Sequence, residues 1–289
     1  MKVGAAQFAS EIGDMDANVE IHLDWIARGV SKKLDLLVMP EMSLVGHYGT
    51  DNLLDVAIKC SDPRLKGLAE AAEDMAIVLG FIEEDSSAGF YNSAAILKNG
   101  KIIHIHRKIN LPSYGKLEEN KFFTKGRYVE TYPLEEDWHA GLLICADVWN
   151  PALAHLAFLQ GTTLMITPVS SGTEAVGPGF DNPSGWELAM RFYSLMYGAP
   201  SIMVNRVGVE KDLTFWGGSR IIGPFGKELA VAGNGEELIV AKLDYDQVRK
   251  ARYQLPTVRD SDVNLVHLET RRFMDAQNTI RKKWDVEDA

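Results

Sequence analysis

The sequence predicts an α/β domain whose sheets are covered on both faces. Short runs of consecutive apolar residues, such as 3–8 and 34–39, are typical of strands that are buried on both sides. Segments with apolar residues at helical spacing lie between these runs. The 289 residues show no fixed-period repeat and no linker rich in proline, glycine and serine. We therefore expect a single domain over residues 1–289.

The N-terminal half begins with the strand at 3–8 and continues into a helix. Asp16 is placed to cap this helix, and Val19, Leu23, Ile26 and Val30 follow at helical spacing. The other elements expected in this half are a helix at 63–72 and strands at 34–39, 76–82, 91–97 and 101–106. An Asn-Gly pair at 99–100 predicts that the last two strands form a hairpin.

The C-terminal half follows a polar loop at 111–127, and loops of that length inside compact domains are often functional. A second long loop, at 169–185, is rich in glycine and serine. The elements expected in this half are strands at 142–145, 164–167, 202–204 and 238–243, helices at 152–159 and 186–197, and a hairpin at 219–230. The charged tail after Tyr245 is expected to pack on a partner or lie loose.

Composition excludes several classes of function. The net charge of −10 argues against nucleic acid as a partner, because phosphate binding needs clustered Lys and Arg. No apolar run approaches the roughly 18 residues needed to span a bilayer. The first ten residues lack the order of a signal peptide, and two cysteines do not form a disulfide framework. We therefore expect a cytoplasmic protein that binds neither membrane nor nucleic acid.

Three apolar runs each end on a reactive side chain. The run at 34–39 leads to Glu41, the run at 101–106 leads to Lys108, and the run at 142–145 ends on Cys145. In open α/β sheets, ligands bind at the carboxyl ends of the strands. The sequence therefore predicts a site with a carboxylate, an amine and a thiol at one sheet edge.

These three groups suit cysteine-based acyl transfer. A free thiol is only a few per cent thiolate at neutral pH, so it needs a base or a neighbouring cation. Glu41 can act as the base and Lys108 as the cation. Lys108 and the backbone N–H of Ala146 can stabilise the oxyanion, and one such donor contributes about 3–4 kcal/mol. A covalent acyl-enzyme would result, which water activated by Glu41 then clears.

Other interpretations are open at this point. Cys145 can be a small buried hydrophobe, Glu41 a helix cap and Lys108 a solvated charge, while Cys60 is expected in the core on an apolar helical face. An S-x-x-K pattern at 113–116 suggests a serine hydrolase but lacks companion motifs. Two histidines at 104 and 106 share a strand face but have no metal-site motif around them, so we expect no metal. A non-catalytic binding protein that retains the fold is a further alternative.

Six segments resemble the nitrilase superfamily of carbon–nitrogen hydrolases in their order along nearly the whole chain. MPEMSLVGHY, HRKINLP and ICADVWNP resemble its glutamate, lysine and cysteine segments. VNRVGVE, FWGGSRIIGPFG and LDYDQVRKAR resemble its later landmarks. The resemblance implies a Glu41–Lys108–Cys145 triad in an α/β fold, a four-layer αββα sandwich of two stacked mixed sheets. It also implies a homodimer or higher homo-oligomer in which the tail, from about residue 250, packs on the partner subunit, and it implies no cofactor.

The resemblance further implies a second glutamate after the lysine, at Glu119, with Glu118 as the alternative. It implies a thiol hydrolase that releases ammonia from a small linear amide or N-carbamoyl amine. A glutaminase or ω-amidase activity, or a nitrile-hydrolysing one, is the alternative within the family. The chain departs from many members in having Ala146 after the cysteine, which leaves the substrate open. Loops after strand ends should line the substrate pocket with Tyr48, Tyr114, Trp149 and Ser170.

Overall fold

The computed structural model describes residues 1–287, with side chains up to residue 278, and it contains two stacked six-stranded sheets. In spatial order, the first sheet consists of β14 (Glu237–Lys242), β1 (Lys2–Gln7), β2 (Leu36–Val38), β3 (Ala76–Glu84), β4 (Phe90–Lys98) and β5 (Lys101–Arg107). Its strands β1, β2 and β3 are parallel, while β14, β4 and β5 pair antiparallel with their neighbours.

The second sheet repeats this plan. In spatial order it consists of β13 (Glu228–Val231), β12 (Arg220–Ile222), β9 (Ser201–Val204), β8 (Leu164–Pro168), β7 (His139–Leu142) and β6 (Thr131–Pro133). Its parallel centre is β7, β8 and β9. A separate hairpin is formed by β10 (Val207–Glu210) and β11 (Leu213–Trp216). Each sheet therefore has a parallel centre, and the site described below takes residues from both sheets, including the antiparallel strands β4 and β5 of the first.

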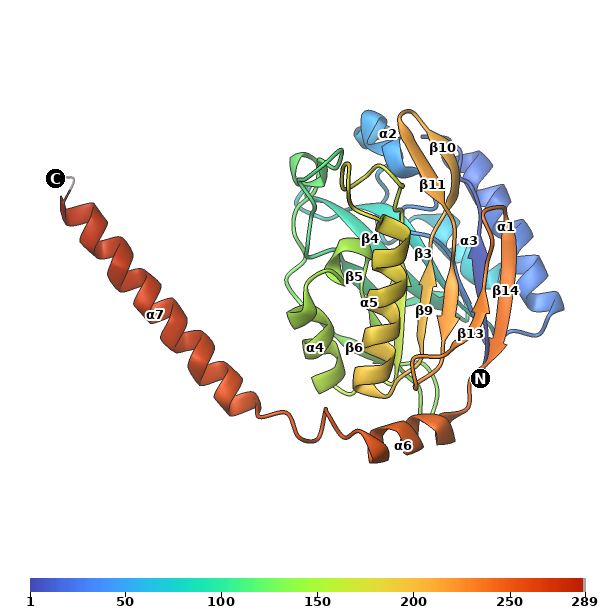
Figure 1. The fold of residues 1–289 in the computed structure, drawn as a ribbon. Helices are drawn as coiled ribbons and strands as arrows, with labels where there is room; N and C mark the ends of the chain where they lie inside the picture. Colours follow the sequence, from blue (N-terminus) through green and yellow to red (C-terminus); the bar gives the residue numbers. More distant parts are fainter. Residues whose placement is uncertain (288–289) are drawn as a thin grey trace.

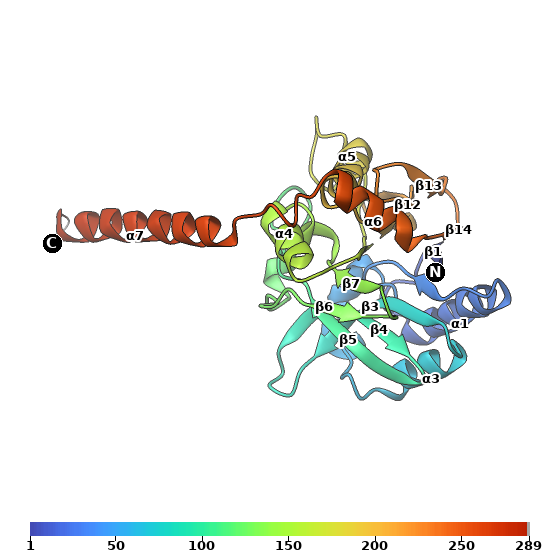
Figure 2. The same cartoon turned by 90° about the horizontal axis from the view of Figure 1, so that it is seen from below.

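Helices cover the outer face of each sheet, which confirms the predicted four-layer sandwich (Figures 1 and 2). The first sheet carries α1 (Met15–Ser31) and α3 (Pro63–Ala71), and the second carries α4 (Pro151–Leu159) and α5 (Asn182–Tyr197). Short elements at the strand ends are η1 (His47–Asn52), α2 (Leu53–Val56), η2 (Glu119–Lys121) and η3 (Cys145–Asp147). None of the helices within residues 1–287 combines the length and apolar character needed to cross a bilayer.

Alternation along the strands of the first sheet sends their side chains into two different cores. Val3 and Val38 point between the sheets and pack in one cluster with residues of the second sheet such as Ile166. Ala6 and Leu37 point the other way and pack in a cluster with α1 and α3. Because neighbouring strand residues face opposite sides, a continuous apolar run fills both cores.

Several predicted boundaries differ in the structure. Asp14, and not Asp16, caps α1, because its carboxylate accepts a hydrogen bond from the backbone N–H of Ala17 at 3.0 Å. Strand β7 starts earlier than predicted and ends at Leu142, so Cys145 lies in a turn and not in the strand. Strands β6, β10 and β11 were not predicted, since they are short and have weak apolar alternation.

The tail is helical. Its first helix, α6 (Tyr245–Gln254), packs on the domain through Val248 and Ala251. The second helix, α7 (Val263–Glu287), projects away from the body (Figures 1 and 2), and its described side chains are exposed. The expected partner for this tail stays a prediction.

Candidate active site

Glu41 lies in a tight turn directly after β2. The next residue, Met42, has a positive φ of 49°, which few side chains adopt without cost. The turn is pressed onto Gly80 of β3, where an added Cβ would lie 2.2 Å from the Met42 nitrogen. The carboxylate of Glu41 is 2% exposed. Backbone shape therefore holds this carboxylate in one place inside the molecule.

Lys108 follows β5 and is completely buried. Its Nζ donates hydrogen bonds to Glu41 Oε1 at 2.7 Å and to Glu119 Oε1 at 2.6 Å. Burial alone would lower the pKa of Lys108, but Glu119 and Glu41 outweigh it, and the pKa lies well above its ordinary value. The amine is therefore a fixed ammonium. Two of its three protons go to these carboxylates, and the third has no acceptor among the residues that the structure describes.

Glu119 is the glutamate that reaches Lys108, whereas Glu118 is exposed and pairs with Lys121. Burial raises the pKa of Glu119 to about 7; Lys108 opposes this shift and Glu41 adds to it. Burial is the main cause, and the second carboxylate adds to it because two buried carboxylates share one ammonium.

Asn92 completes this cluster, and sequence reasoning missed it. Its Nδ2 donates to Glu41 Oε1 at 2.8 Å and to Glu119 Oε2 at 3.3 Å. The signal was a polar side chain inside the apolar strand β4, where a buried amide needs partners.

Cys145 opens the turn η3, three residues after β7 ends. It is 8% exposed and has a φ of 43°, the left-handed region that costs a side-chain residue roughly 1–2 kcal/mol. Burial raises the pKa of the thiol well above its ordinary value; Glu41 raises it further, while Lys108 lowers it. The sulfur therefore lies within electrostatic range of both groups. The sequence predicted that Lys108 would favour a thiolate, but burial and Glu41 outweigh it.

Ser170 follows β8 and connects the second sheet to Glu41. Its backbone N–H donates to Glu41 Oε2 at 2.7 Å and also lies against the Cys145 sulfur. Its hydroxyl is 3.1 Å from His47 Nδ1. Burial, with Arg206 and Lys108 next in effect, lowers the pKa of His47 to about 3, so the ring is neutral. Sequence reasoning missed His47, because nothing in the sequence relates it to Ser170.

A buried ion pair holds the backbone at His47 in place. Glu210 of β10 accepts the backbone N–H groups of His47 at 3.2 Å and Tyr48 at 2.9 Å. Arg206 pairs with Glu210 and stacks over Phe215, 4.5 Å from the ring centroid. The β10–β11 hairpin therefore fixes the segment that follows Glu41.

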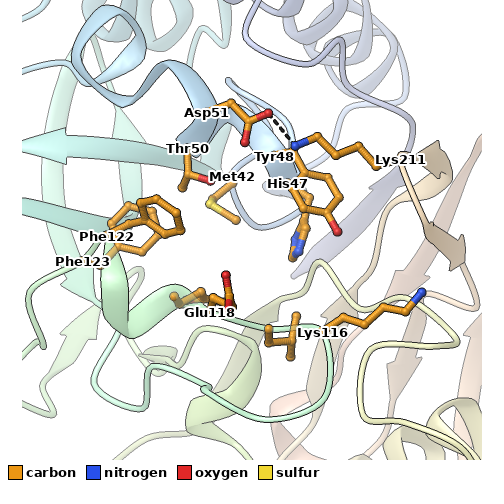
Figure 3. Close-up of a pocket in the computed structure, with 12 residues that line it drawn as sticks. Met42, His47, Tyr48, Thr50, Asp51, Lys116, Glu118, Phe122, Phe123 and Lys211 are labelled. Carbon is orange, nitrogen blue, oxygen red and sulfur yellow. Dashed lines mark hydrogen bonds and ion pairs between the residues drawn. The ribbon is translucent and has the colours of Figure 1, made fainter.

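A cavity of about 190 Å³ borders this cluster (Figure 3). Glu119 of the cluster and the neighbouring His47 line the cavity. An ion pair between Asp51 and Lys211 crosses one side of the cavity. The lining residues are Met42, His47, Tyr48, Thr50, Asp51, Lys116, Leu117, Glu118, Glu119, Phe122, Phe123 and Lys211. The cavity offers space for a small molecule beside the cluster.

The four residues that were predicted to contact substrate lie in different surroundings. Tyr48 lines the cavity, and Ser170 contacts Glu41. Tyr114 is 41% exposed; partial burial, and next the charge of Cys145, raise its pKa to about 12, so it lies near the sulfur. Trp149 packs on Phe180 and on Trp186, 4.7 Å between ring centroids in the latter pair. Substrate contact stays a prediction for all four.

The residues of the competing interpretations do not form the arrangements that those interpretations need. Ser113 is exposed, and Lys116 pairs with Asp212 at 2.9 Å, so the S-x-x-K residues form no buried pair. His106 donates to Asp147, and His104 stacks on Tyr132.

The helical setting predicted for Cys60 is wrong. Helix α2 ends at Val56, and Cys60 lies in a half-buried turn before α3. Its thiol donates to Glu83 Oε1 at 3.4 Å.

Comparisons with known proteins show the family and the fold of the chain. Residues 2–253 match the family model described as carbon-nitrogen hydrolase. An (R)-stereoselective amidase from a Pseudomonas species is 34% identical over 279 residues, covering 95% of this chain and 92% of that protein. The crystal structure of a carbon-nitrogen hydrolase from Helicobacter pylori G27 superimposes with a TM-score of 0.83 and 25% identity, covering 91% and 96% of the two chains.

A longer relative matches only in part. The glutamine-dependent NAD(+) synthetase of Acinetobacter baylyi is 28% identical over 251 residues, which are 86% of this chain. The chain spans only 45% of the length of that synthetase.

Proposed function

The chain belongs to the carbon–nitrogen hydrolase family, and on that premise we propose that it is a thiol amidase that releases ammonia from a small linear amide or N-carbamoyl amine. In this proposal Cys145 is the nucleophile, Glu41 the general base and Lys108 the oxyanion donor. Glu119 holds Lys108 in position. The supporting observation is the buried Glu41–Lys108–Glu119 cluster within electrostatic range of a thiol that stays protonated at rest.

The first step follows from the protonation states. A thiol with a raised pKa must lose its proton as it attacks, and Glu41 is the carboxylate whose charge acts on it most strongly. Sulfur then bonds to the substrate carbon, and the carbonyl electrons move to oxygen. The third proton of Lys108 Nζ and the backbone N–H of Ala146 stabilise that oxyanion.

The second step returns the proton. Protonated Glu41 gives its proton to the departing nitrogen, the C–N bond breaks, and ammonia leaves a thioester on Cys145. Glu41 then removes a proton from water, water oxygen attacks the thioester carbon, and the thiol leaves with that proton. Hydrolysis of an amide therefore consumes one water and gives one acid and one ammonia.

Ammonia release from a substrate panel tests the proposal. The panel contains short linear amides, N-carbamoyl amines, ω-amides including glutamine, and nitriles. We expect turnover of an amide or N-carbamoyl amine by the native protein and by Cys60→Ala, and none by Cys145→Ala. Rapid quenching and mass spectrometry should find the acyl group on Cys145. Equal ammonia release by the native protein and Cys145→Ala would refute the proposal.

A glutaminase-type activity is the second candidate. The similarity to the NAD(+) synthetase, a protein that depends on glutamine, favours it. In the same panel, a kcat/KM for glutamine at least tenfold above that for every N-carbamoyl amine would select this candidate.

The proposal includes a homo-oligomer in which α7 packs on the partner subunit. The support is a set of exposed apolar side chains on α7, namely Val263, Leu265, Val266, Leu268, Phe273 and Met274. Light scattering of the full chain and of a chain ending at residue 261 tests this, and an unchanged mass would contradict it. A cytoplasmic location, for which both cysteines being free thiols is the support, is also part of the proposal.

A further inference from the structure

Asp147 is a completely buried carboxylate next to the site, and the mechanism above does not use it. Its Oδ1 accepts the backbone N–H groups of Ile109 at 3.0 Å and Asn110 at 2.7 Å. Its Oδ2 accepts the backbone N–H of Ile144 at 3.1 Å and the Nε2 of His106 at 2.8 Å. Four donors therefore surround one side chain, which is the arrangement that compensates for burying a charge.

These donors come from two different parts of the fold. His106, Ile109 and Asn110 flank Lys108 on both sides, at the end of the first sheet. Ile144 directly precedes Cys145, after a strand of the second sheet. A single carboxylate therefore ties the segment that carries the ammonium to the turn that carries the sulfur.

A second link runs parallel to the first. The Nδ2 of Asn110 donates to the carbonyl oxygen of Ala146 at 2.7 Å. By contrast, the backbone of Lys108 bonds to β4 and to the loop after β5: its N–H donates to the Asn92 carbonyl and its carbonyl accepts from the Gly126 N–H, each at 2.8 Å. The strand ladder thus fixes Lys108 within the first sheet, whereas Asp147 and Asn110 relate it to the second.

The same carboxylate also supports the strained turn. Cys145 has a φ of 43°, and the backbone N–H of Asp147 donates to the Ile144 carbonyl at 2.9 Å. With the Oδ2 contact to the Ile144 N–H, Asp147 closes the turn on both sides of the cysteine. A strained backbone persists only where its surroundings hold it in place.

Asp147 does not compete for the hydrogen bonds of Lys108. Its oxygens are filled by three backbone N–H groups and one imidazole, whereas Lys108 bonds to Glu41 and Glu119. The side chain therefore acts on the geometry of the site through its hydrogen bonds to the two segments.

We propose that Asp147 is a positioning residue that sets the separation between the Lys108 ammonium and the Cys145 sulfur, with Asn110 as its auxiliary link. The inference rests on the proposed function, because it assigns that separation to the attack step. Misplacement by about 1 Å can cost on the order of 100-fold in rate.

Asp147→Asn is the main test, since it keeps the shape of the side chain but turns one acceptor into a donor facing the Ile144 N–H. We expect kcat to fall about 10- to 100-fold, with KM changed less than about 3-fold, because no substrate contact is altered. Asp85→Asn is the matched control. Asp85 also accepts two backbone N–H groups, those of Ser87 and Gly89, but in a turn away from the site. Its kcat should stay within about 2-fold of the native value.

A second measurement does not require a substrate. The rate at which iodoacetamide alkylates Cys145, followed by mass spectrometry in a Cys60→Ala background, should fall at least about 10-fold in Asp147→Asn and stay unchanged in Asp85→Asn. Melting curves ensure that each variant is folded at the assay temperature. A folded Asp147→Asn protein with native kcat and a native alkylation rate would overturn the inference.

Asn110→Ala keeps the test decisive if Asp147→Asn does not fold. It removes only the link to the Ala146 carbonyl, and kcat should fall about 3- to 10-fold with KM unchanged; a native kcat would overturn the inference. Native protein that turns over no amide would refute the proposed function, whereas slower alkylation of Asp147→Asn would still support Asp147 as the positioning residue.

Discussion

Two places in the molecule combine a thiol, a carboxylate and a cation. Cys145 lies within range of Glu41, which is paired with Lys108. Cys60 contacts Glu83, which is paired with Arg107. The two groups contain the same three kinds of side chain, but they differ in how many of their hydrogen-bonding positions are already occupied.

At the second group every acceptor is occupied. Glu83 receives two hydrogen bonds from Arg107, at 2.9 and 2.6 Å, and one from Ser93 at 2.7 Å, besides the Cys60 thiol. Burial, and next the charge of Glu83, raise the pKa of Cys60 to about 12. This group is a structural ion pair with a thiol at its edge.

At the first group, one ammonium serves two carboxylates and keeps a proton free. The sulfur also lies in a strained turn instead of a relaxed one, and a cavity borders the cluster. Free hydrogen-bonding positions and backbone strain, more than residue types, therefore distinguish a reactive site from a structural one. Four pairs of variants test this difference, beginning with the pair that should differ most.

Replacing the two thiols should give opposite results. Cys145→Ala should lower kcat by at least about 10⁴-fold, because no other group can form the covalent intermediate. Cys60→Ala should keep kcat within about 2-fold, with a small change in melting temperature. Steady-state ammonia release measures both, and a Cys60 variant that lost activity would remove the distinction.

Replacing the cation of each group should also give different results. Lys108→Met leaves Glu41 and Glu119 buried without their ammonium, so unfolding free energy should fall by about 3–5 kcal/mol and kcat by about 10³-fold. Arg107→Met should cost less stability, because its side chain is 35% exposed, and should leave kcat nearly unchanged. Urea unfolding and kinetics at one pH test the pair. Near-native kcat in Lys108→Met would contradict the oxyanion assignment.

The β3 backbone beside the Glu41 turn should tolerate an added Cβ less well than an open helix position does. Gly80→Ala places a Cβ 2.2 Å from the Met42 nitrogen, so the Glu41 turn must shift. We expect a loss of about 1–3 kcal/mol in stability and a kcat about 10- to 100-fold lower.

Gly67→Ala is the matched control, since nothing lies within 4 Å of the added Cβ in α3. It should leave kcat unchanged and raise stability by about 0.5–1 kcal/mol. Equal effects from both glycine variants would show that the Glu41 turn is not tightly constrained.

Glu119 and Glu83 should respond to pH with opposite signs. The pKa of Glu119 is raised to about 7, so its contribution to stability is present below about pH 4.5 and lost as pH rises through 7. The pKa of Glu83 is lowered: burial opposes this, but Arg107 and Ser93 prevail. Its contribution is present above about pH 4.5 and lost as pH falls below that value.

Urea unfolding of native protein, Glu119→Gln and Glu83→Gln at pH 4, 5.5 and 8 measures this. Relative to Glu119→Gln, native protein should lose about 1–3 kcal/mol of unfolding free energy between pH 4 and 8. Relative to Glu83→Gln, it should lose stability only toward pH 4. The same sign for both differences would remove the contrast.

The sequence predicted most of the framework because the framework depends on local patterns. Continuous apolar runs predicted the central strands, and the Asn-Gly pair at 99–100 predicted the β4–β5 turn, where Asn99 and Gly100 both have positive φ. Short edge strands such as β6 escaped prediction, because three residues carry too little pattern to be recognised.

Local sequence patterns are enough to predict which reactive side chains lie near strand ends, since strand position and side-chain type are both local. Which of these groups meet depends on the packing of the whole fold. The pairing of Lys108 with Glu119 and not Glu118, and the bridge of Asp147 to both segments, depend on how two sheets stack. The backbone N–H of Ser170 that contacts Glu41 looks, in sequence, like every other N–H in the chain. Such partners are chosen by packing between residues far apart in sequence, because buried polar groups must find donors and acceptors wherever the fold brings them.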